Sequence, residues 1–181
     1  MKNKSLIAVI FVLVAVIALA AAVYPSLADK AAETTTAEQG SISDTVQYQK
    51  YKDVKIYDNK GNAVMLSEFE GKPVILNFWA TWCGYCIQEM PDFEDTFREY
   101  GDDIQFMIVN TDDGIGNGEK YLSDKGYTFP SYYDLEYNAA ITYGISGIPR
   151  TIAIDKDGNI RYNRSGMIDA EALQSIIDMI K

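Results

Sequence analysis

Residues 74–91 read V-I-L-N-F-W-A-T-W-C-G-Y-C-I-Q-E-M-P, and this stretch decides the fold. Its first part, residues 74–80, is an apolar run rich in β-branched and aromatic side chains, which is typical of a strand buried on both faces. Its last part has apolar residues at helical spacing, namely Ile87, Met90, Phe93 and Phe97. The only two cysteines of the chain, Cys83 and Cys86, therefore stand where a strand turns into a helix.

The first turn of a helix favours a cysteine thiolate. Its backbone N–H groups have no partners within the helix, and the helix dipole places partial positive charge there. Both effects lower the pKa of a thiol, so that the nucleophile is present at neutral pH. We therefore assign the attacking role to Cys83. Cys86, one turn deeper, would resolve the mixed disulfide by attacking the sulfur of Cys83.

Two other interpretations of the cysteine pair are less favourable. A zinc site needs about four ligands, whereas the chain has two cysteines and no histidine. A purely structural disulfide across three residues would close almost no loop, and so would contribute little stability. The spacing therefore favours a redox-active pair, without a metal or any cofactor other than the Cys83–Cys86 disulfide itself.

The run N-F-W-A-T-W-C-G-Y-C-x-x-E-M-P resembles the active-site signature of the thioredoxin superfamily, and more narrowly that of extracytoplasmic thiol–disulfide oxidoreductases of the TlpA/ResA type. The resemblance extends from about Tyr51 to Lys181. It implies an α/β thioredoxin fold, a mixed central sheet with helices on both faces, with an extra N-terminal β-hairpin and an inserted helix. Residues 143–149, Y-G-I-S-G-I-P, are similar to the family's loop that carries a cis-proline.

The resemblance also implies a buried acid near the cysteines. Thioredoxin has a buried Asp six residues before its first cysteine, where this chain has Asn77, which cannot take a proton. In TlpA/ResA-type proteins a Glu at the place of Glu89 is thought to do this work. Burial would raise the pKa of Glu89 toward neutrality and let it shuttle the proton of Cys86. The alternative is an ordinary solvated carboxylate near the start of a helix.

Four further residues are expected to contact substrate. We expect Trp82, beside Cys83, to be a partly exposed contact residue. Tyr85 stands where thioredoxin has Pro between its cysteines, so thioredoxin's reduction potential does not carry over. By the resemblance, the Ile148–Pro149 bond is cis and faces the cysteines, where the Ile148 backbone can pair with a bound peptide.

The remaining pattern predicts the other elements of the domain. Predicted strands lie at residues 54–57, 63–66, 104–109, 131–134, 151–154 and 160–162, and predicted helices at residues 86–100, 119–125, 137–143 and 169–180. Ser67 is expected to cap a short turn, and Asp169 the last helix. Residues 110–118, N-T-D-D-G-I-G-N-G, contain three glycines and are predicted to form a loop.

The N-terminal region predicts an extracytoplasmic protein. Residues 6–23 form an uncharged apolar run of 18 residues after Lys2 and Lys4, just long enough for a membrane helix. We favour an uncleaved anchor at residues 1–28 over a signal peptide cleaved after Ala28, and both place the domain outside the cytoplasm. Residues 29–47 are small, polar and acidic, as in a flexible linker, and residues 48–181 have the size of one domain.

Charge and family together indicate the partners. The formal net charge of −10 argues against nucleic acid, whose binding relies on Lys and Arg. The resemblance implies exported disulfide-containing proteins as substrates, such as apocytochrome c during cytochrome c maturation or a methionine sulfoxide reductase. It also implies a membrane electron donor of the CcdA/DsbD type.

The sequence thus predicts a thiol–disulfide oxidoreductase. We favour a reductase over an oxidase, because the family resemblance implies a membrane donor that would deliver electrons to a domain outside the cytoplasm. The alternatives are a disulfide oxidase of DsbA-like polarity, a thiol peroxidase of the peroxiredoxin type, and a non-catalytic binding or chaperone domain. A peroxidase would have Thr three residues before its reactive cysteine, where this chain has Ala80.

Overall fold

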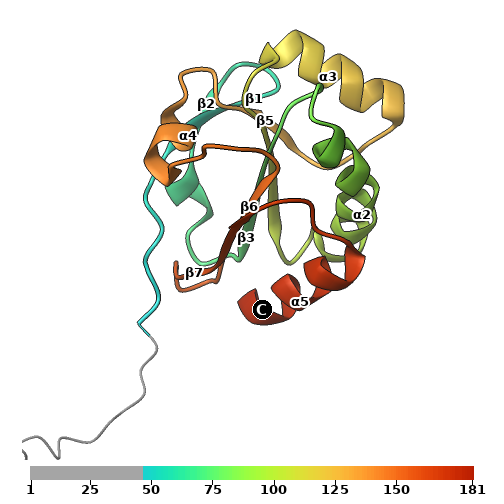
Figure 1. Cartoon of the computed structure of the whole chain (residues 1–181). Helices are drawn as coiled ribbons and strands as arrows, with labels where there is room; N and C mark the ends of the chain where they lie inside the picture. Colours follow the sequence, from blue (N-terminus) through green and yellow to red (C-terminus); the bar gives the residue numbers. More distant parts are fainter. Residues whose placement is uncertain (1–46) are drawn as a thin grey trace, which may run out of the picture. The chain divides into compact units, whose positions relative to one another are not determined.

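A seven-stranded mixed sheet forms the centre of the domain (Figure 1). The computed structural model describes residues 47–181, and Gln47–Lys181 forms one compact unit. The predicted anchor lies outside the described residues, as does the predicted linker apart from residue 47. Within residues 47–181, no helix has both the length and the apolar character that a membrane crossing requires.

The strand order is β2-β1-β5-β4-β3-β6-β7. The strands are β1 (Lys55–Asp58), β2 (Ala63–Met65), β3 (Val74–Trp79), β4 (Gln105–Asn110), β5 (Ser131–Tyr133), β6 (Arg150–Ile154) and β7 (Ile160–Ser165). The helices are the 3-10 helix η1 (Leu66–Phe69), α2 (Gly84–Tyr100), α3 (Gly114–Lys125), α4 (Asn138–Tyr143) and α5 (Ala170–Ile180). This is the expected thioredoxin fold, with β1–β2 as the extra hairpin and α3 as the inserted helix.

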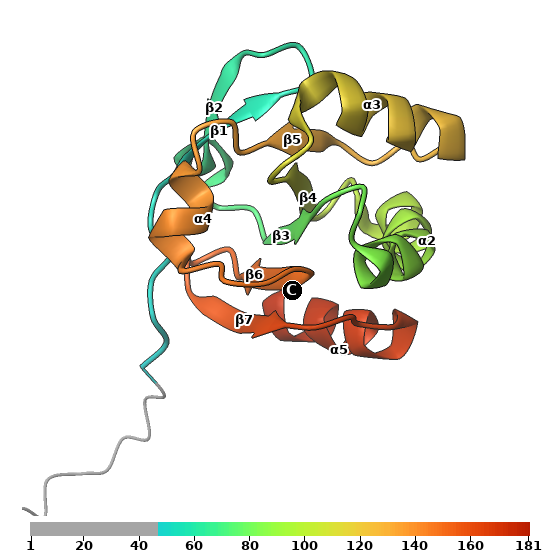
Figure 2. The same cartoon turned by 45° about the horizontal axis from the view of Figure 1, so that its top comes forward.

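Strand β3 is the middle of the fold because it is apolar on both faces. It pairs in parallel with β4 and antiparallel with β6. Side chains of alternate residues point to opposite faces of a strand. Ile75 and Trp79 therefore join the core beneath α2, α3 and α5, whereas Leu76 and Phe78 join the core beneath α4 and η1. Figures 1 and 2 show α4 on one side of the sheet and α2, α3 and α5 on the other.

Two local predictions are wrong. Helix η1 begins after Met65, whose backbone N–H donates to the Glu68 carboxylate at 2.8 Å, so Ser67 lies inside the helix and does not cap it. The predicted loop at residues 110–118 is half helix, since α3 begins at Gly114. The glycines made the sequence pattern look less helical than it is. One of them, Gly118, allows the helix to pack closely on Tyr133, because a Cβ on Gly118 would lie 2.6 Å from Cε1 of that ring.

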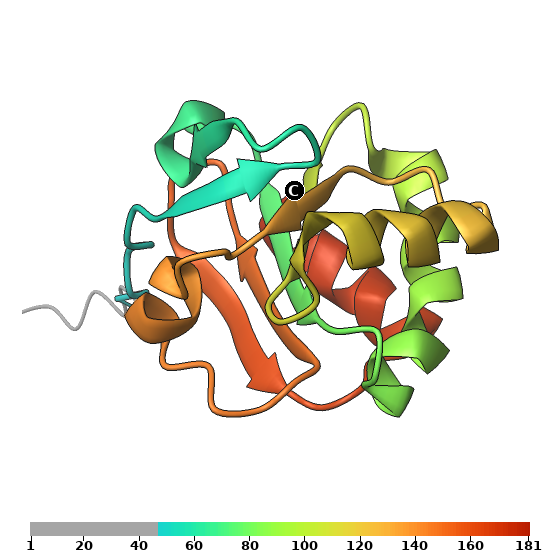
Figure 3. The ribbon, with the colours of Figure 1, turned by 90° about the horizontal axis from the view of Figure 1, so that it is seen from above.

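The first described residues run along the turn between β6 and β7. The N–H of Tyr51 donates to the carbonyl of Gly158 at 2.9 Å, and the N–H of Ile160 donates to the carbonyl of Gln49 at 2.8 Å. This turn follows Ile154, which pairs with Val74 at the start of β3. The turn therefore lies at the opposite end of the sheet from Trp79, where β3 ends. Figure 3 shows the chain near residue 50 (cyan) and the start of α2 (green) on opposite sides of the domain.

Replacing Gly118 by Ala should destabilise the domain by about 1–3 kcal/mol, because the new methyl group would overlap the buried ring of Tyr133. Gly116→Ala is the matched control on the same helix, since a Cβ there would have no neighbouring atom within 4 Å and alanine favours helix by about 0.5–1 kcal/mol. Urea unfolding of both variants measures the difference. Equal stability of the two variants would contradict the packing role of Gly118.

Candidate active site

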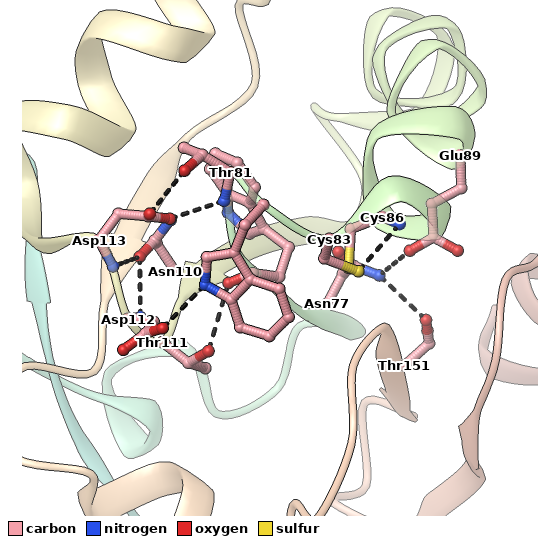
Figure 4. Close-up of a disulfide and its surroundings, with 12 residues drawn as sticks. Asn77, Thr81, Cys83, Cys86, Glu89, Asn110, Thr111, Asp112, Asp113 and Thr151 are labelled. Carbon is pink, nitrogen blue, oxygen red and sulfur yellow. Dashed lines mark hydrogen bonds between the residues drawn. A yellow bond between two sulfur atoms is a disulfide. The ribbon is translucent and has the colours of Figure 1, made fainter.

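The two cysteines lie at the junction of β3 and α2. Cys83 is the N-cap of α2, and its Sγ accepts a hydrogen bond from the backbone N–H of Cys86 at 3.2 Å. The two residues form a disulfide (Figure 4). Cys83 is 6% exposed and Cys86 is fully buried, so of the two cysteines only Cys83 has any surface in contact with solvent. A thiolate on Cys83 would accept the same N–H hydrogen bond, which stabilises its charge.

A buried carboxylate lies one turn further along α2. Glu89 is 1% exposed and accepts hydrogen bonds from Nδ2 of Asn77 at 2.7 Å and from the backbone N–H of Ile168 at 3.0 Å. Nδ2 of Asn77 also donates to Oγ1 of Thr151 at 3.2 Å. Through Asn77 the carboxylate is linked to β3 and β6 (Figure 4), and through Ile168 it is linked to the segment before α5. The alternative of a solvated Glu89 is wrong.

Two buried carboxylates on α2 show how the surroundings set acidity. Burial raises the pKa of Glu89 to about 7, although the hydrogen bonds from Ile168 and Asn77 act in the opposite direction. Burial also opposes ionisation of Glu94, but there the hydrogen bonds from Thr128, Arg98 and Phe129 prevail and hold the pKa below its usual range. Among the ion pairs of the described residues, Glu94 has Arg98 as a partner and Glu89 has none.

A polar loop after β4 holds the residues that precede Cys83. The Asp113 carboxylate accepts from the backbone N–H of Thr81 at 2.7 Å, from its hydroxyl at 2.6 Å, and from Nδ2 of Asn110 at 2.7 Å. Nε1 of Trp82 donates to the Asp112 carboxylate at 2.8 Å. Figure 4 shows these hydrogen bonds beside the disulfide.

The sequence pattern alone did not identify Asp112 and Asp113 as site residues. A usable signal was present, since N-T-D-D directly follows a buried strand. Strands β3 and β4 are parallel neighbours, so their carboxyl ends meet at one edge of the sheet. Polar residues after β4 are thereby brought to the residues that follow β3.

The predicted contact residues have the following positions. The Ile148–Pro149 peptide bond is cis, which confirms that prediction. Trp82 and Tyr85 are each 66% exposed, whereas Pro149 is buried. Trp82 and Ile148 line the same hollow beside the disulfide, and Tyr85 does not line it. Within residues 47–181, no group of three or more Cys, Asp or Glu side chains is arranged to hold a metal ion.

A comparison with protein families decides the classification, because the family model named Redoxin matches residues 47–176. The chain belongs to the redoxin family. The thiol-disulfide oxidoreductase ResA of Geobacillus thermodenitrificans is 32% identical over 130 residues, which are 71% of this chain and 75% of that protein. ResA of Halalkalibacterium halodurans is also 32% identical, over 68% of this chain and 71% of that protein.

Solved structures agree with this assignment. The pneumococcal exposed lipoprotein thioredoxin of Streptococcus pneumoniae has a TM-score of 0.60 at 28% identity, covering 70% of this chain and 99% of that one. StoA of Bacillus subtilis, with a TM-score of 0.61 at 23% identity, covers 70% of this chain and 96% of that chain and supports the fold. The redoxin chain is thus a TlpA/ResA-type member of the thioredoxin superfamily and a thiol–disulfide oxidoreductase.

Glu89→Gln should change how the stability of this redoxin depends on pH. The pKa of Glu89 is about 7 in the folded protein against 4.5 for a free side chain, so the folded state holds this proton more tightly. The contribution of Glu89 to stability is therefore fully present below pH 4.5 and is lost as the pH rises to about 7. The loss amounts to about 3 kcal/mol.

Urea unfolding of the oxidised proteins from pH 4.5 to pH 8 measures this effect. The difference in unfolding free energy between Glu89→Gln and the wild type should shift in favour of the variant as the pH rises. Asp95→Asn, an exposed position on the same helix, is the control and should show no such shift. A constant difference for Glu89→Gln would mean that the carboxylate is ionised throughout this range.

Proposed function

We propose that this redoxin reduces disulfides in exported proteins, with Cys83 as the nucleophile, Cys86 as the resolving thiol and Glu89 as the acceptor of the Cys86 proton. One observation carries the proposal: Cys83 is slightly exposed and its sulfur caps a helix N-terminus, while the fully buried Cys86 precedes by one turn a buried carboxylate that has no ion-pair partner. The arrangement separates an attacking sulfur from a protected one.

The reaction takes two steps and moves two electrons. The Cys83 thiolate attacks one sulfur of the substrate disulfide, and the other substrate sulfur leaves as a thiolate, which takes a proton from solvent. Cys86 then gives its proton to the Glu89 carboxylate and attacks Sγ of Cys83. The second substrate sulfur leaves as a thiolate and takes a proton, while Glu89 loses its proton to solvent, so that the substrate is reduced and the Cys83–Cys86 pair is oxidised.

Substrate contacts follow from the exposed side chains around Cys83. Trp82 and Tyr85, which precede and follow Cys83 in the sequence, are exposed and can present aromatic surface to a substrate. The backbone of Ile148, before the cis-proline Pro149, is proposed to pair with an extended substrate segment as in thioredoxins. This pairing would hold the substrate sulfur in line with Cys83.

We place the domain outside the cytoplasm, attached by an anchor at residues 1–28. The apolar run at residues 6–23 supports this placement, as does the similarity to a pneumococcal exposed lipoprotein. Each turnover leaves the pair oxidised, so a reductant must restore the thiols. We assign this role to a membrane electron donor of the CcdA/DsbD type, and propose apocytochrome c or a methionine sulfoxide reductase as substrates.

The peroxidase alternative would need a threonine near Cys83, and the nearest one in the sequence is Thr81, two residues before it. Its hydroxyl donates to Asp113, and its backbone N–H donates to the same carboxylate. The hydroxyl proton of Thr81 is therefore donated to the loop after β4 and not toward a substrate at Cys83.

Trapping of a mixed disulfide tests the roles of the two cysteines. The Cys86→Ser variant, mixed with a peptide disulfide, should accumulate a covalent adduct at Cys83, because the resolving thiol is absent. Cys83→Ser should form less than about a tenth of that adduct, because Cys86 is fully buried. Mass spectrometry quantifies the adduct formed by each variant. Adduct formation chiefly on Cys83→Ser would reverse the two roles.

The same reaction tests Glu89. In single-turnover exchange, Glu89→Gln should slow release of the reduced peptide by about tenfold or more, because general base assistance is lost, while adduct formation by Cys83 stays nearly unchanged. Asp95→Asn is the control. Equal slowing of both steps would point to a general structural effect.

The midpoint reduction potential of the Cys83–Cys86 pair tests the direction of electron flow. A reductase should lie near thioredoxin, at about −270 mV, and an oxidase near DsbA, at about −120 mV. Equilibration of the full chain with redox buffers gives the value. A potential near that of DsbA would show that the pair oxidises exported thiols instead.

A further inference from the structure

The surface beside the disulfide is hollowed beyond the cysteine loop itself. A first hollow of about 410 Å³ lies between Trp82 and the loop that ends at the cis-proline. A second hollow of about 170 Å³ adjoins it. Both are bounded by Thr111, Asp112 and Tyr137, so the two hollows adjoin, and we call them together the side groove.

The two parts of the side groove differ in chemistry. The walls of the first hollow are mainly apolar and include Trp82, Ile145 and Ile148. The second hollow is bounded by the exposed Asp112 and by Asp134, which is buried and whose carboxylate is bonded to the backbone at the start of α4. Among the described residues that line either hollow, none is a Lys or an Arg. A ligand that extends from the first hollow into the second therefore leaves a mainly apolar surface and passes the negative charge of Asp112, which borders both hollows.

Tyr137 forms the wall between the hollows in an unusual backbone conformation. Its φ of 55° lies in the left-handed region, and it is the only residue other than glycine in residues 47–181 with a positive φ. Asp134 fixes this conformation: its carbonyl accepts from the N–H of Tyr137 at 3.1 Å, and its carboxylate accepts from Ala139 and Ala140 at 3.1 and 2.7 Å. A tyrosine is unfavourable in this conformation, and the Tyr137 side chain is 52% exposed. Packing in the folded domain therefore does not explain why a tyrosine occupies this position.

Asp112 has a charge that can be removed without displacing its neighbours. Its Oδ2 accepts the hydrogen bond from Nε1 of Trp82, and the side chain borders both hollows of the groove. An asparagine keeps an oxygen that can accept this hydrogen bond. Asp112→Asn therefore isolates the effect of charge on a ligand.

We propose that the side groove selects substrates in which a bulky apolar residue lies beside the reacting cysteine and a Lys or Arg lies a few residues further from it. The apolar side chain occupies the first hollow against Tyr137, and the basic side chain pairs with the exposed carboxylate of Asp112 at the second. This selectivity rests on the proposed function, since it requires the substrate sulfur to reach Cys83. Tyr137 and Asp112 are then specificity-determining residues that take no part in the exchange chemistry.

Four synthetic peptides test this selectivity. Each is closed by an intrapeptide disulfide and carries Leu or Ser beside one cysteine, and Lys or Glu about two to four residues further. The full reduced chain should react with the Leu/Lys peptide at least about tenfold faster than with the Ser/Glu peptide. Hydroxyethyl disulfide, which is too small to reach the groove, reports the exchange chemistry alone.

Two variants should separate the two parts of the preference. Asp112→Asn should lower the preference for Lys over Glu by about threefold to fivefold, as expected for an exposed ion pair, and should keep the preference for Leu. Tyr137→Gly should remove most of the preference for Leu over Ser, although its melting temperature should not fall, because glycine adopts a positive φ freely. Ile141→Ala, an exposed position on α4 outside the groove, is the control and should change neither preference.

The outcomes distinguish this inference from the proposed function. If the wild type reduces hydroxyethyl disulfide no faster than Cys83→Ser does, the proposed function fails. If the wild type reduces it but reacts equally with all four peptides, the selectivity is wrong and the function stands. Retention of both preferences in Asp112→Asn and Tyr137→Gly would likewise overturn the assignment of these two residues.

Discussion

A buried carboxylate with no cation beside it is the interaction on which the site depends. Glu89 is held only by neutral donors, an amide from β3 and a backbone N–H from the segment before α5. These donors satisfy its oxygens without removing the unfavourable effect of burial, so the pKa stays near neutrality. A cation at the position of Asn77 would favour the ionised form and remove the group's capacity to exchange a proton at neutral pH.

The fold makes this arrangement possible by placing a continuous apolar strand at its centre. Because β3 is buried on both faces, the chain that leaves it must turn at once into a helix that covers the sheet. The unpaired N–H groups of that helix then meet the first cysteine, and its next turn carries Glu89 into the core. The redox pair and the acid are thus positioned by the same helix, whereas the loop after β4 fixes the residues on the other side of Cys83.

Strand β3 and the cysteine pair could be predicted from the sequence, because the local sequence pattern there agrees with the position of these residues in the fold. The run at residues 74–80 has no polar side that would suggest an edge strand, and two cysteines at helical spacing need one another for their chemistry. Glu89 was found through family resemblance, since no local pattern distinguishes a buried glutamate on a helix from an exposed one. The start of α3 was missed because three glycines outweighed the helical pattern, whereas Gly118 is required by the ring of Tyr133, which lies on a later strand. The side groove was missed for a related reason: Asp112 and Tyr137 come together only through the sheet order.

The pairing of residues 49–51 with the β6–β7 turn fixes where the polypeptide enters the domain. That turn and the disulfide lie at opposite ends of β3, a strand of six residues and therefore about 20 Å long. The chain therefore enters the domain at one end of the sheet, whereas the reactive sulfur lies at the other end. A large folded protein can therefore approach Cys83 without passing the point at which the chain enters the domain.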